Sequence, residues 1–173
     1  MAELVAIGPD DVLGPARAEI EALWLEVWPT ATPERLDEIF PRHAAREGFR
    51  MITVRAGDRL VGLAYGYLGS PGEWWHDRVS AAMTPEQRAE WLPPGHFELA
   101  ELMVSPAERR RGLGGRLHDA MLAGLRAPTA VLSTQHNNDA ALALYSRRGW
   151  QLLLEAVDLA APTPYVVMGK RLR

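Results

Sequence analysis

The stretch RRRGLGGRL, residues 109–117, is the most informative part of the sequence. Three arginines run into a loop with three glycines, and an amphipathic helical pattern follows over residues 112–126. Glycine lets the backbone approach a ligand closely, and the N–H groups of a first helical turn, together with the helix dipole, attract an anion. The stretch therefore predicts an anion-binding site at the start of this helix.

Two phosphate-binding motifs fit this stretch poorly. A P-loop places a lysine and then a hydroxyl residue after its second glycine, and this chain has neither there. The Rossmann motif needs a third glycine where this chain has Leu117, and no acidic residue ends a following strand about 20 positions on. From these residues alone, an ordinary helix start beside a solvated run of charge stays open as the alternative.

The composition excludes several classes of protein. The chain has 173 residues, 47% of them hydrophobic, and a net charge of -3, which suits one globular domain better than a nucleic-acid-binding protein. Because it has no cysteine, disulfides and thiolate nucleophiles are excluded. We find no secretory signal, no apolar run of membrane length and no metal-binding spacing among the histidines. We therefore expect a cytoplasmic protein without membrane partners or metal.

Hydrophobic periodicity indicates alternating strands and helices. Thr32 is the expected N-cap of one helix, and Pro41 is expected to kink or split that helix. Residues 70–95 break the pattern and are predicted to be an inserted excursion with one short helix at 84–91. Strands are expected at 4–8, in a hairpin over 49–69, and at 96–106, 129–134, 150–159 and 164–172; helices are expected at 15–28, 32–48, 112–126 and 137–149. This order predicts a single mixed α/β domain over residues 1–173.

Two motifs in this order resemble those of the GCN5-related N-acetyltransferase (GNAT) family. The first is VSPAERRRGLGGRL, residues 104–117, which contains the acyl-CoA signature Arg/Gln-x-x-Gly-x-Gly/Ala at 109–114. The second is NNDAALALYSRRGW, residues 137–150, which is similar to Asn-x-x-Ala-x-x-Leu-Tyr-x-x-x-Gly-Phe with Trp150 in place of the phenylalanine. The matching order of elements extends the resemblance over nearly the whole chain.

The resemblance implies a fold and an activity. The implied fold is a central mixed, mostly antiparallel sheet with helices on both faces and a splayed strand pair at the cofactor site. The implied activity is an N-acetyltransferase, an acyltransferase that moves an acetyl group from acetyl-CoA to a primary amine, with a small-molecule acceptor favoured over a protein. A monomer or homodimer without nucleic-acid partners is expected. The alternative is a non-catalytic acyl-CoA-binding or regulatory module of the same fold.

The resemblance also implies which residues bind coenzyme A. The strand before the glycine loop is expected to hydrogen-bond the pantetheine arm with its backbone, and the loop to bind the diphosphate. Asn138 is expected to contact the coenzyme, and it would also serve as a helix cap. The full set is Leu102, Met103, Val104, Arg109, Arg110, Arg111, Gly112, Leu113, Gly114, Gly115 and Asn138.

Three residues are candidates for the chemistry. An amine must lose a proton to attack, and the leaving thiolate benefits from receiving one. Glu98, six residues before Val104, matches where several family members carry the base, and Glu101 is its rival on the same strand. Strand alternation places the two glutamates on opposite faces unless a bulge intervenes. Tyr145 matches the family tyrosine that protonates the thiolate. The alternatives are solvent-facing strand glutamates and a packed helix tyrosine.

The acceptor site is the least constrained part of the sequence. Trp74 and Trp75 stand beside Glu73 in the 70–95 segment, and aromatic rings with a carboxylate suit a cationic amine. These three residues are the expected acceptor contacts. The alternative is that the tryptophans close the core beneath the segment.

Overall fold

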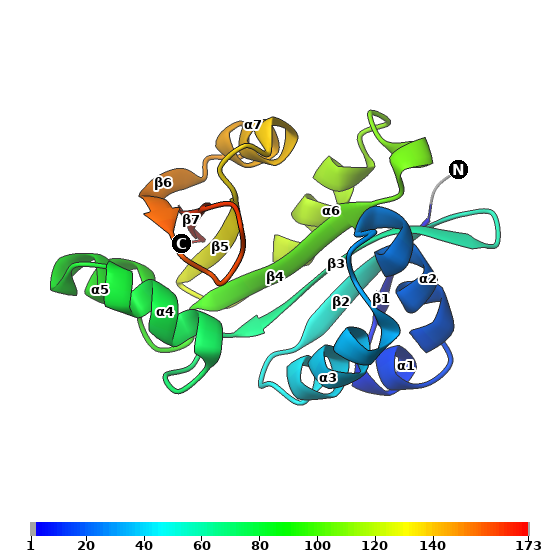
Figure 1. Ribbon diagram of the computed structural model, residues 1–173, viewed down its shortest axis with the longest axis horizontal. Coiled ribbons are helices and arrows are strands. Elements are labelled where there is room, and N and C mark those ends of the chain that lie inside the picture. The colour runs from blue at the N-terminus through cyan, green and yellow to red at the C-terminus, as the bar shows by residue number, and fades with distance from the viewer. Residues whose placement is uncertain (1–2, 173) are drawn as a thin grey trace. The chain divides into compact units, whose positions relative to one another are not determined.

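The computed structural model describes residues 3–172, and the chain divides into two compact units. The first unit comprises Met1–Tyr67 and Ala100–Gly124, and the second comprises Leu68–Leu99 and Leu125–Arg173. Strand β4 (Phe97–Val104) passes from the second unit into the first, so each unit holds part of it. The elements are labelled in Figure 1. A single domain over the whole chain stays a prediction.

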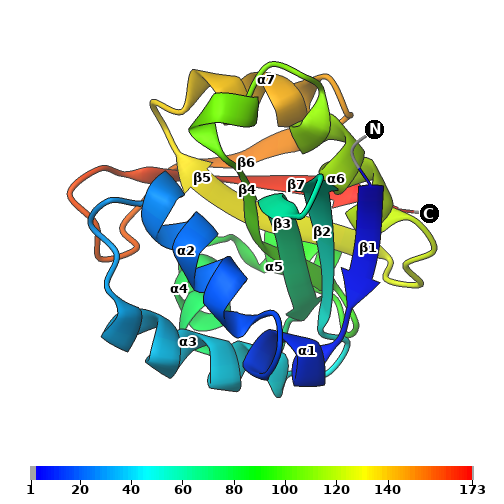
Figure 2. The same cartoon turned by 90° about the vertical axis from the view of Figure 1, so that its right-hand side faces the viewer.

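The first unit is built on an antiparallel hairpin. Strands β2 (Arg50–Ala56) and β3 (Arg59–Leu68) pair across a turn in which Gly57 has a φ of +61°, a conformation that favours glycine. Strand β1 (Glu3–Ile7) pairs antiparallel with β2 on its other side (Figure 2). The Ser105 N–H donates to the Val61 carbonyl at 2.8 Å and ties the end of β4 to β3. The sequence predicted this hairpin and its turn, and both are confirmed.

Helices cover both faces of this unit because side chains alternate along β3. Leu63, Tyr65 and Tyr67 join one core with the residues of three helices: α1 (Pro9–Leu13), α2 (Arg17–Val27) and α3 (Pro33–Ala44). On the opposite face, a Cβ on Gly62 would lie 3.1 Å from Leu117 of α6 (Leu113–Leu122). The glycine therefore allows α6 to pack closely against the strand.

The second unit pairs its strands in the order β4-β5-β7-β6. Strands β5 (Thr129–Gln135) and β6 (Gln151–Val157) each pair antiparallel with β7 (Tyr165–Arg171), while β4 pairs in parallel with β5 through Phe97 and Glu98. Val79 of α4 (Trp74–Ala82) and Trp91 of α5 (Pro85–Trp91) pack on this sheet. Helix α7 (Asp139–Ser146) precedes β6. The mixed, mostly antiparallel sheet that was predicted is confirmed.

The excursion predicted over 70–95 is more regular than expected. It contains two helices, α4 as well as the expected α5, so the prediction of irregular chain is wrong for residues 74–82. Helix α4 gives a weak sequence signal because only His76 and Val79 of its nine residues are buried. Helix α3 also continues through Pro41 without a break, with Thr32 as its N-cap as predicted. Among residues 3–172, no helix has the length and apolarity needed to cross a membrane.

Candidate functional site

The glycine loop in the first unit begins helix α6 with an open N-terminus. A short 3-10 turn, η1 (Pro106–Glu108), leads from β4 into the loop. Arg110 has a φ of +63° and Gly112 a φ of +75°, so the backbone turns twice through the left-handed region. Gly112 is the N-cap, no side chain caps the helix, and its first turn carries no acidic residue. The first-turn N–H groups have no intrahelical acceptor and are available to an anion.

The three arginines before the helix have different surroundings. The Arg109 Nε donates to the Val104 carbonyl at 3.2 Å, which ties the loop to the end of β4. Arg111 pairs with Glu108 at 2.7 Å. All three side chains are exposed. Arg109 therefore shapes the loop, while the cluster supplies positive charge that attracts an anion.

Two backbone groups at the end of β4, before the loop, are bound by side chains. The Leu102 N–H donates to a carboxylate oxygen of Glu101 at 3.0 Å, and the Val104 carbonyl accepts from Arg109. Met103 buries its side chain in the core of the first unit. Of the three residues expected to hold pantetheine, Leu102 thus has its N–H committed to Glu101.

Glu101 has an environment suited to proton transfer near neutral pH. Burial raises the pKa of its carboxyl to about 7, and the Leu102 N–H and the Trp28 indole offset part of that rise. The pKa of the nearby Tyr65 is also raised. Burial of Tyr65 is the largest cause, followed by the charges of Tyr67 and of Glu101. The side chain is half-buried, so solvent still reaches it.

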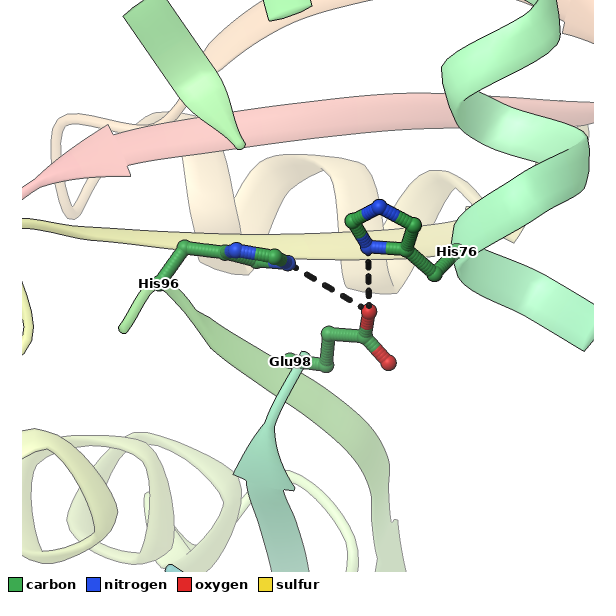
Figure 3. A group of neighbouring side chains, drawn as sticks. All are labelled: His76, His96 and Glu98. Atoms are coloured by element: carbon green, nitrogen blue, oxygen red, sulfur yellow. Dashed lines mark hydrogen bonds and ion pairs between the residues drawn. The ribbon is translucent and has the colours of Figure 1, made fainter. Parts of the chain in front are cut away.

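Glu98 lies in the second unit with two histidines (Figure 3). Its Oε1 is 3.4 Å from His96 Nε2 and 3.5 Å from His76 Nδ1. All three side chains are buried, and the two imidazole centroids are 5.1 Å apart. Burial alone would raise the pKa of Glu98, but the hydrogen bonds and charges of His76 and His96 outweigh it, so the pKa falls below its ordinary value.

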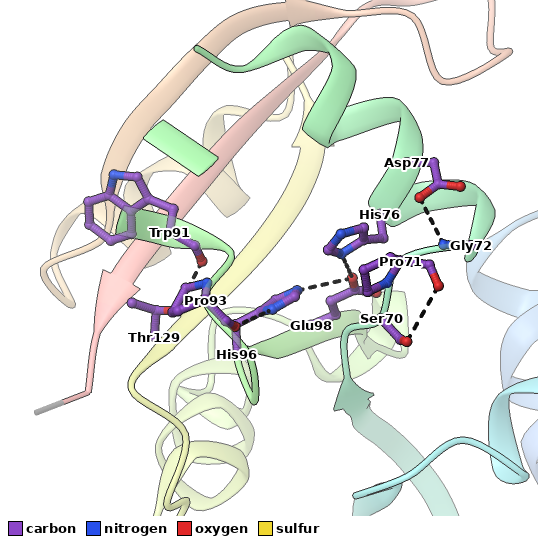
Figure 4. Close-up of polar contacts among 10 residues, drawn as sticks. All are labelled: Ser70, Pro71, Gly72, His76, Asp77, Trp91, Pro93, His96, Glu98 and Thr129. Atoms are coloured by element: carbon purple, nitrogen blue, oxygen red, sulfur yellow. Dashed lines mark hydrogen bonds and ion pairs between the residues drawn. The ribbon is translucent and has the colours of Figure 1, made fainter. Parts of the chain in front are cut away.

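Local hydrogen bonds hold this cluster in place (Figure 4). The His96 Nδ1 lies 2.9 Å from the Pro93 carbonyl, and Thr129 Oγ1 donates to the Trp91 carbonyl at 3.0 Å, which fixes the turn that leads into His96. On the other side, the Gly72 N–H donates to Asp77 at 3.0 Å and fixes the start of α4. His76 lies on α4, His96 precedes β4 and Glu98 lies on β4, and this arrangement brings the three side chains together.

His76 and His96 are the site residues that the sequence did not reveal. His96 stands two residues before Glu98, so strand alternation could have placed both on one face. His76 comes from α4, the helix that was not predicted, and nothing in the sequence links it to Glu98. Glu98 and Glu101 fall in different units.

The second family motif lies on α7 and after it. The Asn138 carboxamide oxygen accepts from the Ala141 N–H at 3.2 Å, so this residue caps α7 as expected. Tyr145 is buried, with its ring centroid 5.6 Å from that of Trp150. The cap leaves the Asn138 side-chain N–H groups for other contacts.

The three expected acceptor contacts differ in exposure. Trp74 is 52% exposed, and the Arg78 guanidinium lies 5.1 Å from its ring centroid. Trp75 instead packs against the core of the second unit and donates its indole N–H to Ser133 Oγ at 2.9 Å. Glu73 is the residue before the first turn of α4. Trp75 therefore has a structural role in any case, and acceptor binding by these residues stays a prediction.

The sequence pattern of the Acetyltransferase (GNAT) family matches residues 15–150. The chain belongs to this family. It is 33% identical over 121 residues to the GCN5-like protein acetyltransferase Rv2170 of Mycobacterium tuberculosis, in a match covering 65% of this chain and 59% of that protein. It is 41% identical over 137 residues to the N-alpha-acetyltransferase RimI of the same organism, in a match covering 78% of this chain and 70% of that protein.

Solved structures of other proteins share the fold. A GNAT-family structure from Desulfovibrio desulfuricans matches with a TM-score of 0.69 and 16% identity, covering 100% of both chains. The ribosomal-protein-S18-alanine N-acetyltransferase of Escherichia coli matches with a TM-score of 0.68 and 13% identity, covering 99% of this chain and 94% of that one. Family and fold agree with the resemblance read from the two motifs.

The raised pKa of Glu101 has a measurable consequence for stability. The folded chain holds the Glu101 proton up to about pH 7, whereas the unfolded chain releases it near its ordinary pKa. Stability is therefore lost as pH rises through this window. We expect Glu101→Gln to flatten this fall in urea unfolding, and to remove a carboxyl resonance with a midpoint near pH 7 from the NMR titration. If no glutamate titrates above about pH 5.5, roughly one unit over the ordinary pKa of a glutamate, the assigned environment is wrong.

Proposed function

We propose that this chain transfers an acetyl group from acetyl-CoA to a primary amine. The observation that carries the proposal is the uncapped start of α6, where Gly112 turns the backbone and the first helical turn carries no acidic residue. That geometry suits a diphosphate, which is the charged centre of coenzyme A. Membership of an acetyltransferase family supports the same donor.

We assign cofactor binding to backbone N–H groups at the start of α6 and at the end of β4. The N–H groups of Leu113, Gly114 and Gly115 would bind the diphosphate, with the arginine cluster attracting it. The Val104 N–H would face the pantetheine arm or polarise the thioester carbonyl, since the Leu102 N–H donates to Glu101 and the Met103 N–H lies on the same edge as that of Ser105, which donates to β3. Asn138 would contribute its side-chain amide.

We assign the general base to Glu101. The amine must give up a proton before its nitrogen attacks the thioester carbon, and a base is most effective with a pKa near the working pH. Glu101 has a pKa of about 7 and is half-buried, whereas the histidines around Glu98 lower its pKa and all three are buried. Position along the strand favoured Glu98, but these environments favour Glu101.

The general acid assigned to the leaving group is Tyr145. As the new C–N bond forms and the C–S bond breaks, the Tyr145 hydroxyl would give its proton to the thiolate, and the proton taken from the amine would reside on Glu101. The ring is held by packing against Trp150, so its position is fixed in the free protein.

We compare two classes of primary amine as acceptors: small molecules and the amino groups of polypeptides. The sequence favoured a small molecule because aromatic rings and a carboxylate begin α4. The relatives are named as a protein acetyltransferase and an N-alpha-acetyltransferase, which points to the amino group of a polypeptide. Thiol release from acetyl-CoA, measured over a panel of polyamines, small amines and peptides with free amino termini, separates these classes. Coenzyme binding without thiol release for any acceptor would support the non-catalytic alternative.

The loop assignment is tested by Gly114→Val. A side chain in the first turn of α6 would stand between the backbone N–H groups and the diphosphate, so we expect acetyl-CoA binding to be lost in calorimetry while the circular dichroism spectrum is kept. Gly8→Val is the matched control, since a Cβ at Gly8 meets nothing within 4 Å. Normal acetyl-CoA affinity in a folded Gly114→Val protein would show that the loop is not the coenzyme site.

The base assignment is tested by the pH profile of kcat. Wild-type turnover should rise through an inflection near pH 7 as Glu101 ionises. Glu101→Gln should lower turnover most at low pH, remove that inflection and recover partly at high pH, where the free amine becomes common. Glu98→Gln is the comparison and should keep the inflection. The reverse outcome, with the inflection lost only in Glu98→Gln, would move the base to Glu98.

The acid assignment is tested by Tyr145→Phe, which keeps the ring and its packing on Trp150. We expect kcat to fall by roughly ten- to ten-thousand-fold, the usual range for acid–base catalysis, with acetyl-CoA affinity little changed. Pre-steady-state kinetics would first establish that chemistry limits turnover. Unchanged turnover under that condition would leave Tyr145 a packing residue only.

A further inference from the structure

We propose that His76, His96 and Glu98 bind a divalent transition-metal ion, with Zn²⁺ as the best fit. The three ligand atoms lie within 4.8 Å of one another, and all three residues are buried. Two imidazoles and one carboxylate are a donor set that proteins use for zinc, with a fourth position left for water. The transfer proposed above uses Glu101 and Tyr145 and does not depend on this site.

The distances from Glu98 Oε1 to the two histidine nitrogens fit a shared metal ion and are long for charge-assisted hydrogen bonds. Zinc lies about 2.0–2.1 Å from a histidine nitrogen, so two ligands of a tetrahedral ion are about 3.4 Å apart. Glu98 Oε1 is 3.4 Å from His96 and 3.5 Å from His76. A charge-assisted hydrogen bond from imidazolium to carboxylate would be about 2.7–2.9 Å long, well below both values.

The second nitrogen of His96 supports metal binding by its first. The His96 Nδ1 is 2.9 Å from the Pro93 carbonyl, and a carbonyl only accepts, so Nδ1 is the nitrogen that carries hydrogen. When His96 is charged, its Nε2 donates to the Glu98 oxygen; when His96 is neutral, Nε2 presents a lone pair there, and this is the form that can bind a metal. A cation between the two atoms removes their repulsion, and a backbone carbonyl bound to the other ring nitrogen is the usual support of a metal-bound histidine.

Gly69 leaves the space that the site requires. A Cβ at this position would lie 2.0 Å from His96 Nε2 and 2.4 Å from Glu98 Oε1. Its backbone N–H donates to the His96 carbonyl at 3.0 Å, which keeps this close approach. Any side chain here would enter the space beside both donor atoms, so glycine is needed for the cluster to exist in this form.

The test is direct metal binding by the full chain without acetyl-CoA. Protein stripped with a chelator and dialysed would be titrated with Zn²⁺ against a chromophoric zinc indicator. We expect one tight site per chain. His76→Ala and Glu98→Gln should each weaken it by at least about 100-fold, because a lost ligand costs no less than a lost supporting contact. His136→Ala, a change at an exposed histidine, is the matched control and should bind normally.

A second measurement keeps the test decisive if a variant fails to fold. X-ray absorption of the zinc-loaded wild-type protein should show two imidazole nitrogens with oxygen ligands completing the shell. The proposal is overturned if the wild-type chain binds no Zn²⁺ tightly, if folded His76→Ala and Glu98→Gln bind as well as wild type, or if the spectrum lacks two imidazoles. Because no step of this test involves acetyl transfer, absence of transferase activity would leave its result unaffected.

Discussion

The proposed transferase site and the proposed metal site both depend on the desolvation of the Glu101 and Glu98 carboxylates on β4. A buried carboxylate must take up a proton or find donors for its charge. Glu101 takes up a proton, since its pKa rises to about 7. Glu98 finds donors, with two histidine nitrogens directed at one oxygen and a lowered pKa. Two glutamates three residues apart on one strand therefore have opposite chemistry because their neighbours differ.

The parts of the fold that the sequence predicted are those held by interactions over short stretches of chain. Thr32 caps α3 through the Arg35 N–H, and Asn138 caps α7 through the Ala141 N–H. Gly57 forms the hairpin turn, and Gly112 starts α6. Each of these signals lies within three or four residues of the structure it forms. The resemblance to the family supplied the mixed, mostly antiparallel sheet, which local patterns alone did not give.

The parts that were missed depend on contacts between distant residues. Helix α4 is held by Val79 in the core and by the bond from Trp75 to Ser133, 58 residues away. Only two of its residues are buried, so its periodicity is weak and its composition suggested an irregular excursion. Because His76 lies on this helix, its contact with Glu98 could not be predicted from the sequence either. The alternative kept for the tryptophans, that they close the core, describes Trp75 but not the exposed Trp74.

The position of His76 also limits the ability of Glu98 to act as a base. Packing of α4 on the sheet of the second unit fixes His76 independently of any ligand, and the Pro93 carbonyl fixes His96. Both rings direct a nitrogen at Oε1 of Glu98, so a cation held by the histidines would take up a lone pair of that oxygen. An oxygen occupied in this way has a weakened affinity for the proton of an amine. The geometry that would make Glu98 a good ligand would thus make it a poor base, in agreement with our proposal that the half-buried Glu101 takes the proton of the amine.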